Sequence, residues 1–129
     1  MVFELQQYLY GLKESVALFS EQFRDADHEV LWIAHVSSDL RFLKLVDYHG
    51  DQSCVIAPVR EIITDVLESK SDAIVLAHNH LSGDPRPSPD DILFTSKLCS
   101  ISKEMDFTVL DHIIFAGRQW SSMRQLGLM

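Results

Sequence analysis

The chain has 129 residues, of which 47% are hydrophobic and 23% charged, and this composition predicts one globular domain with a single core. No segment reaches the ~18 consecutive apolar residues of a membrane span, and the first residues do not form a signal peptide, so we expect a cytoplasmic protein without a membrane partner. The net charge of −8 argues against nucleic acid as a partner, because phosphate binding requires basic patches.

The first predicted element is an amphipathic helix from residue 3 to about residue 24. Its apolar residues recur every three or four positions, which favours packing against the core, and the alternative is the contact helix of a homodimer. The apolar stripe consists of Leu5, Leu9, Leu12, Val16, Phe19 and Phe23.

The rest of the chain alternates short apolar runs with helical patterns. Strands are expected at 29–36, 40–47, 53–57, 73–77, 107–115 and 119–123. Helices are expected from residue 58 to about 69 and from residue 89 to about 104. A mixed sheet covered by helices is the simplest way to bury these elements, so the predicted class is α/β.

Two histidines follow the apolar run 73–77. Side chains alternate between the faces of a strand, so His78 and His80 project to the same side. The Gly- and Pro-rich segment 81–87 predicts a loop. Ser88 and Pro89 then mark the start of a helix, which places Asp91 in its first turn.

Two imidazoles and a carboxylate form a donor set that suits zinc, and a catalytic zinc site has three protein ligands with a fourth position for water. We therefore predict one zinc ion per chain, bound by His78, His80 and Asp91. A simple helix cap would explain Ser88 and Asp91 without a metal, but it would not explain either histidine.

A metal-activated water needs a base, and Glu29 is a candidate because it stands immediately before the apolar run 30–34. A glutamate at the mouth of a strand can face a cleft. The alternative is an ordinary solvated carboxylate at a strand end.

Other metal-site classes do not fit. No H-E-x-x-H helix is present, and a (β/α)₈ barrel needs about 250 residues. A zinc deaminase needs a C-x-x-C pair, whereas Cys54 and Cys99 lie far apart and are predicted to be reduced core thiols.

The spacing of Glu29, His78, His80, Ser88 and Asp91 resembles the JAMM (MPN+) metallopeptidase signature. The amino-acid sequences of segments 58–62, 78–88, 110–114 and 127–128 are similar to those of the RadC-like branch of these proteins. The resemblance covers residues 27–129 and leaves residues 1–26 outside it as an N-terminal amphipathic helix. It implies a three-layer, cytidine-deaminase-like fold, with flanking helices on a sheet.

The resemblance further implies a zinc metallopeptidase that hydrolyses a peptide or isopeptide substrate. In that scheme His78, His80 and Asp91 are the zinc ligands, Glu29 is the general base, and Ser88 hydrogen-bonds the developing oxyanion. Two alternatives stay open: a non-hydrolytic interaction module that keeps zinc and acts with partners in DNA repair or metabolism, and a nuclease. Leu81 departs from the family pattern, which has proline after the second histidine.

Asp111 and His112 also belong to the resemblance, in the predicted strand 107–115. Asp111 is expected either to hydrogen-bond a metal-bound imidazole or to form an ordinary core hydrogen bond. Neither residue is placed among the ligands.

Overall fold

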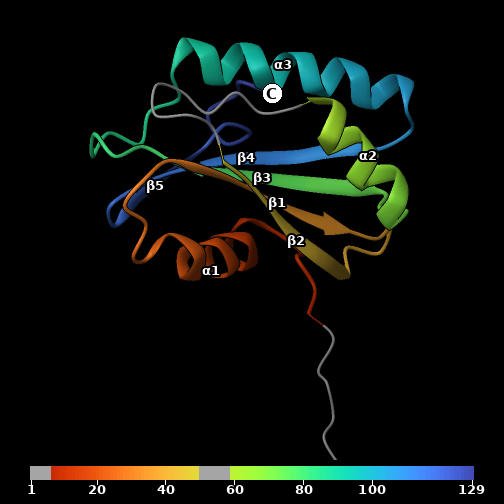
Figure 1. Cartoon of the computed structure of the whole chain (residues 1–129), viewed down its shortest axis with the longest axis horizontal. Coiled ribbons are helices and arrows are strands. Elements are labelled where there is room, and N and C mark those ends of the chain that lie inside the picture. The colour runs from red at the N-terminus through yellow and green to blue at the C-terminus, as the bar shows by residue number, and fades with distance from the viewer. Residues whose placement is uncertain (1–6, 50–58) are drawn as a thin grey trace, which may run out of the picture.

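A mixed sheet of five strands forms the middle layer of the computed structural model, which describes residues 7–49 and 59–129 (Figure 1). The strands are β1 (Val30–Val36), β2 (Phe42–His49), β3 (Ala73–Asn79), β4 (Thr108–Ala116) and β5 (Gln119–Ser122). Their spatial order is β2-β1-β3-β4-β5. β3 and β4 are parallel, and the other neighbouring pairs are antiparallel.

Three helices cover the two faces of the sheet: α1 (Leu12–Phe23), α2 (Val59–Ser69) and α3 (Pro89–Glu104). α2 and α3 lie on one face, and α1 lies on the other (Figure 1). The predicted α/β class, with a mixed sheet between helices, is confirmed. The strand expected at 53–57 lies outside the described residues, as do Pro58 and Cys54.

β3 occupies the centre of the sheet, between β1 and β4. All of its residues are buried, as expected for a continuous apolar run that is covered on both faces. The single core expected from the composition is in fact divided by the sheet into two clusters, and alternate residues of β3 enter each of them. Ile74 and Leu76 pack with α2 and α3, whereas Val75 and Ala77 pack on the side of α1.

The stripe on α1 is part of the core, as the sequence predicts. Phe19 is fully buried, and Leu9 is almost so. Leu5 lies outside the described residues. The helix itself, however, begins at Leu12 and not at residue 3, so the prediction is wrong for residues 7–11.

Residues 7–9 are extended because they pair with the chain that enters β2. Phe42 N donates to Gln7 O (2.7 Å), and Leu9 N donates to Leu40 O (2.9 Å). Leu40 has a positive φ of 66° and belongs to the turn after β1, where its N–H donates to Ser37 O (2.9 Å). β2 therefore begins at Phe42, two residues later than the sequence predicts.

Among the residues that the structure describes, no helix is long and apolar enough to span a membrane.

Candidate metal centre

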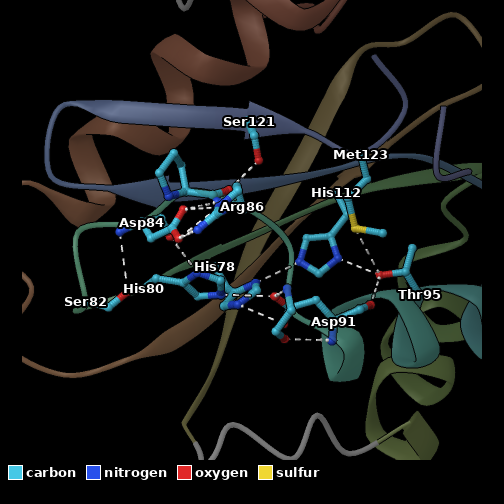
Figure 2. A network of polar contacts seen from close by, with 12 residues as sticks. His78, His80, Ser82, Asp84, Arg86, Asp91, Thr95, His112, Ser121 and Met123 are labelled. Carbon is cyan, nitrogen blue, oxygen red and sulfur yellow. Dashed lines mark hydrogen bonds and ion pairs between the residues drawn. The ribbon is translucent and has the colours of Figure 1, made fainter. Parts of the chain in front are cut away.

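His78 lies near the end of β3 and His80 directly follows that strand, and both lie on the face of the sheet that α3 covers (Figure 2). Their ring centroids are 4.8 Å apart. Asn79 between them bonds toward β1: its Oδ1 accepts from Val30 N (2.8 Å), and its Nδ2 donates to His28 O (3.0 Å). The alternation predicted from the sequence is therefore present.

Asp91 reaches both histidines from the first turn of α3. Its Oδ1 lies 3.1 Å from His78 Nε2, and its Oδ2 lies 3.0 Å from His80 Nε2. One ligand atom from each of the three residues lies within 4.8 Å of the others. In the described part of the chain this is the one group of at least three His, Cys, Asp or Glu side chains that could hold a metal ion.

The capping arrangement considered from the sequence is also present, and it orients the carboxylate. Ser88 Oγ accepts from Asp91 N (3.1 Å), while Asp91 Oδ2 accepts from Ser88 N (2.8 Å). Pro89 stands at the first helical position. The same carboxylate thus caps α3 and faces the two imidazoles. The interpretations of Asp91 as a helix cap and as a metal ligand therefore do not exclude each other.

Asp91 is ionised at neutral pH. Burial works to raise the pKa of its carboxyl group, but the hydrogen bond and charge of His78 and the bonds from Ser88 outweigh it. The net effect is a pKa well below the ordinary value for an aspartic acid. A half-buried anion therefore faces two imidazole nitrogens.

The hydrogen bonds of His80 show that this arrangement fits a cation. Its Nδ1 lies 2.9 Å from the backbone oxygen of Asp84, which can only accept, so Nδ1 carries a proton. In the neutral ring, Nε2 then turns a lone pair toward the Asp91 carboxylate. A cation at this point, either a second proton on the ring or a metal ion, removes the repulsion. Two imidazole nitrogens and a carboxylate are a donor set that suits zinc.

A cleft of about 610 Å³ opens over this group. The three residues lie in its wall, together with Glu29 and Ser88. Glu29 is half-buried and precedes β1, which starts at Val30 rather than at residue 29. All five site residues predicted from the sequence therefore line one cleft.

The loop between His80 and Ser88 forms another part of the cleft wall. Asp84 and Arg86 make an exposed ion pair (2.7 Å), and this hydrogen bond lowers the pKa of Asp84 to about 2. Ser121 Oγ donates to the backbone oxygen of Pro85 and ties the loop to β5 (Figure 2). Leu81, which departs from the family pattern, is exposed. It does not belong to the metal group, which consists of His78, His80 and Asp91.

His112, and not Asp111, contacts the metal group. His112 Nε2 lies 2.8 Å from His78 Nδ1. Asp111 instead forms core hydrogen bonds, which was the second of the two roles expected from the sequence. It accepts from Ser122 Oγ (2.6 Å) and from Arg124 N (3.1 Å).

A register shift explains which of the two residues faces the cleft. β4 pairs with β3 as Ile74↔Val109 and then as Val75↔Asp111, so one residue is skipped. Strict alternation from Val109 would turn Asp111 toward α3. The irregularity moves the alternation by one residue, so that His112 shares the face of Leu76.

Thr95 contacts the candidate site and was not predicted from the sequence. Its Oγ1 lies 2.6 Å from His112 Nδ1 and 2.7 Å from the backbone oxygen of Asp91. It is almost fully buried. A signal was present, because Thr95 follows Asp91 by four residues in a predicted helix and therefore lies on the same helical face.

The sequence of this chain matches the model of a known protein family. The RadC-like JAB domain matches residues 10–128. The match begins earlier than the boundary at residue 27 suggested by the motifs. It thus includes α1, whose Phe19 packs into the core of the sheet.

Curated relatives bear the name UPF0758 protein. That of Clostridium acetobutylicum is 32% identical over 118 residues, which are 91% of this chain and 52% of the relative. That of Neisseria meningitidis serogroup C is 42% identical over 71 residues, 55% of this chain and 32% of the relative. The Roseiflexus castenholzii protein is 35% identical over 81 residues, with shares of 63% and 35%.

The chain spans about half the length of these relatives, or less. The family match, in contrast, extends over nearly all of this chain. The protein belongs to the RadC-like JAB domain family.

Proposed function

We propose that this domain is a zinc-dependent hydrolase that cleaves amide or isopeptide bonds. The observation that carries the proposal is the convergence of two imidazole nitrogens and one carboxylate in the wall of an open cleft that Glu29 and Ser88 also line. Membership in the RadC-like JAB domain family supports it.

His78, His80 and Asp91 would hold the zinc ion. When bound there, zinc supplies Lewis acidity that activates water near neutral pH and polarises a substrate carbonyl. The half-buried, ionised Asp91 favours a cation between the imidazoles, and its capping bonds to Ser88 fix its orientation. These residues need little rearrangement to accept an ion.

Glu29 would act as the general base and then as the general acid. Its carboxylate takes a proton from the attacking water and delivers that proton to the leaving amine. It lines the same cleft as the ligands, from the segment before β1 rather than from β3 or α3.

Ser88 would donate a hydrogen bond to the carbonyl oxygen as negative charge develops on it. Its Oγ accepts from Asp91 N, and this use of a lone pair leaves the hydroxyl hydrogen for the substrate. Capping and oxyanion stabilisation are therefore compatible roles for one hydroxyl group.

The charges of the cleft favour an amide over a phosphodiester. Glu29 and the exposed Asp90 line it without an ion-pair partner among the described residues, and Arg86 is neutralised by Asp84. A nucleic-acid backbone would meet uncompensated carboxylates there. Leu31 and Phe94 add apolar wall that suits a peptide chain.

The test separates chemistry from metal binding by removing the charge of Glu29. Glu29→Gln should keep the zinc content of the wild type, because the residue is not a ligand, and should lower the cleavage rate of an isopeptide-linked peptide library by about 10²–10⁴-fold. Glu68→Gln, on the exposed side of α2, removes the same charge and should cleave like the wild type.

Two other results would reject the proposal. If zinc-loaded wild type cuts no peptide or isopeptide, the domain is a binding module that retains the metal. If it cuts DNA in a zinc-dependent manner that Glu29→Gln abolishes, the domain is a nuclease.

A further inference from the structure

Two buried side chains, His112 and Thr95, continue inward from His78 of the metal group as a chain of hydrogen bonds (Figure 2). His78 Nδ1 lies 2.8 Å from His112 Nε2, and His112 Nδ1 lies 2.6 Å from Thr95 Oγ1. Thr95 Oγ1 in turn lies 2.7 Å from the backbone oxygen of Asp91. The chain thus leaves one ligand and returns to the residue that provides another.

Two proton arrangements satisfy this chain when both rings are neutral, because a neutral imidazole donates from one nitrogen and accepts at the other. In the first, Thr95 donates to His112, His112 donates from Nε2 to His78, and His78 donates from Nε2 to Asp91. In the second, His78 donates from Nδ1 to His112, and His112 donates from Nδ1 to Thr95. The Thr95 hydroxyl then donates to Asp91 O.

A metal ion is compatible with only the second arrangement. The His78 Nε2 atom that faces Asp91 must offer a lone pair to the ion, so the ring proton must sit on Nδ1. Each ring keeps one N–H in either arrangement, and the number of protons in the chain does not change. In the change from the first arrangement to the second, His78 Nε2 loses its proton to solvent, the His112 Nε2 proton passes to His78 Nδ1, the Thr95 hydroxyl proton passes to His112 Nδ1, and the Thr95 oxygen takes up one proton from solvent.

Thr95 allows this change without movement of heavy atoms. Its hydroxyl has an acceptor at hydrogen-bond distance in each arrangement: His112 Nδ1 in the first and Asp91 O in the second. Thr95 and His112 are each 1% exposed, so water does not compete for these bonds.

We propose that His112 and Thr95 are positioning residues that support the metal-binding tautomer of His78, in which the proton is on Nδ1 and the Nε2 lone pair faces the metal, by accepting that proton's hydrogen bond and passing it on to the Asp91 backbone oxygen. His80 needs no such device, because its Nδ1 faces a backbone oxygen that accepts in all states. This inference rests on the metal-binding part of the proposed function.

The test measures zinc affinity at fixed pH by competition with a chelator. Thr95→Val keeps the shape of the side chain but leaves the His112 Nδ1–H without an acceptor, and zinc affinity should fall about 10- to 100-fold. Thr95→Ser restores the hydroxyl and should restore affinity. Thr64→Val is the matched control, since Thr64 makes the same helical bond, to Arg60 O, on the exposed side of α2.

A second measurement needs no variant. In ¹⁵N-histidine spectra of the zinc-loaded wild type, His78 and His112 should both carry their proton on Nδ1. A His112 proton on Nε2 in that state would overturn the inference, as would a folded Thr95→Val protein with wild-type zinc affinity. If the wild type binds no zinc at all, the proposed metal site itself fails, and the inference fails with it.

Discussion

His35, a third buried histidine, lies in β1 away from the cleft. Its Nδ1 is 2.9 Å from Ser71 Oγ, and its Nε2 has no hydrogen-bond partner within the described parts of the chain. Burial, with a smaller contribution from the charge of Lys44, lowers the pKa of His35 to about 4. Between pH 6.5 and about pH 4, the folded protein therefore keeps this ring neutral, whereas the unfolded chain would protonate it.

This difference makes the stability of the fold depend on pH. Between the unfolded pKa of 6.5 and the folded pKa of about 4, the unfolded chain binds more protons, so the free energy of unfolding rises with pH. The stabilisation is complete above pH 6.5 and decreases as the pH falls toward 4. At 1.36 kcal/mol per pKa unit, the His35 share is about 3 kcal/mol.

Urea unfolding at pH 4.5 and pH 7 checks this share. The loss of stability at pH 4.5 should be smaller in His35→Phe than in the wild type by about 2–3 kcal/mol, because phenylalanine cannot take up a proton. The other titrating groups are common to both proteins and cancel in the comparison. Equal losses in the two proteins would show that His35 does not drive the effect.

Local rules were enough to predict that His78, His80 and Asp91 lie together. His78 and His80 share a face because strand side chains alternate, and Asp91 reaches them because Ser88 and Pro89 start the helix one turn earlier. His112 required knowledge of the register between β3 and β4. That irregularity arises from pairing between segments far apart in the sequence, and no pattern within β4 reveals it.

At the scale of elements, Asn79 joins the end of β3 to the entry of β1. Both polar atoms of its buried amide bond to backbone: one to Val30 N, the other to His28 O. Because these bonds hold the segment that carries Glu29 beside the strand that carries His78, they connect the fold to the geometry of the cleft.

Removal of this amide should destabilise the protein. Asn79→Ala leaves a backbone donor and a backbone acceptor without partners at the sheet end, and we expect the free energy of unfolding to fall by about 1–3 kcal/mol. Gln119→Ala removes an exposed amide at the start of β5 and should change it by less than about 0.5 kcal/mol. Chemical denaturation measures both, and equal effects would contradict the connecting role of Asn79.

Element boundaries were predictable where the signal lies within the element. Both ends of α3 agree with the sequence prediction, since Ser88 and Pro89 form a strong start and the helical pattern runs to Glu104. The start of α1 was not predicted, because residues 7–9 pair with the chain that enters β2. Helical periodicity continues through that segment and conceals the long-range pairing.

For the whole molecule, the sheet order determines the site. β1 and β4 flank β3, so the residue before β1 and His112 of β4 both approach the end of β3, while α3 crosses the same face. Composition indicated one domain, and the alternation of apolar runs with helical patterns indicated the α/β class. Neither could give this strand order, which depends on contacts between distant segments. The metal group connects the central strand to α3, so a bound ion should stabilise the folded state.

Zinc content after loading and desalting tests whether His78, His80 and Asp91 bind one zinc ion. The wild type should retain one zinc per chain. Asp91→Asn keeps a side-chain acceptor for the helix cap but removes the charge and should lose the metal, whereas Asp90→Asn, the same change at the exposed neighbouring position, should retain it. A wild type without zinc, or Asp91→Asn with the full zinc content, would show that these three residues do not form a zinc site.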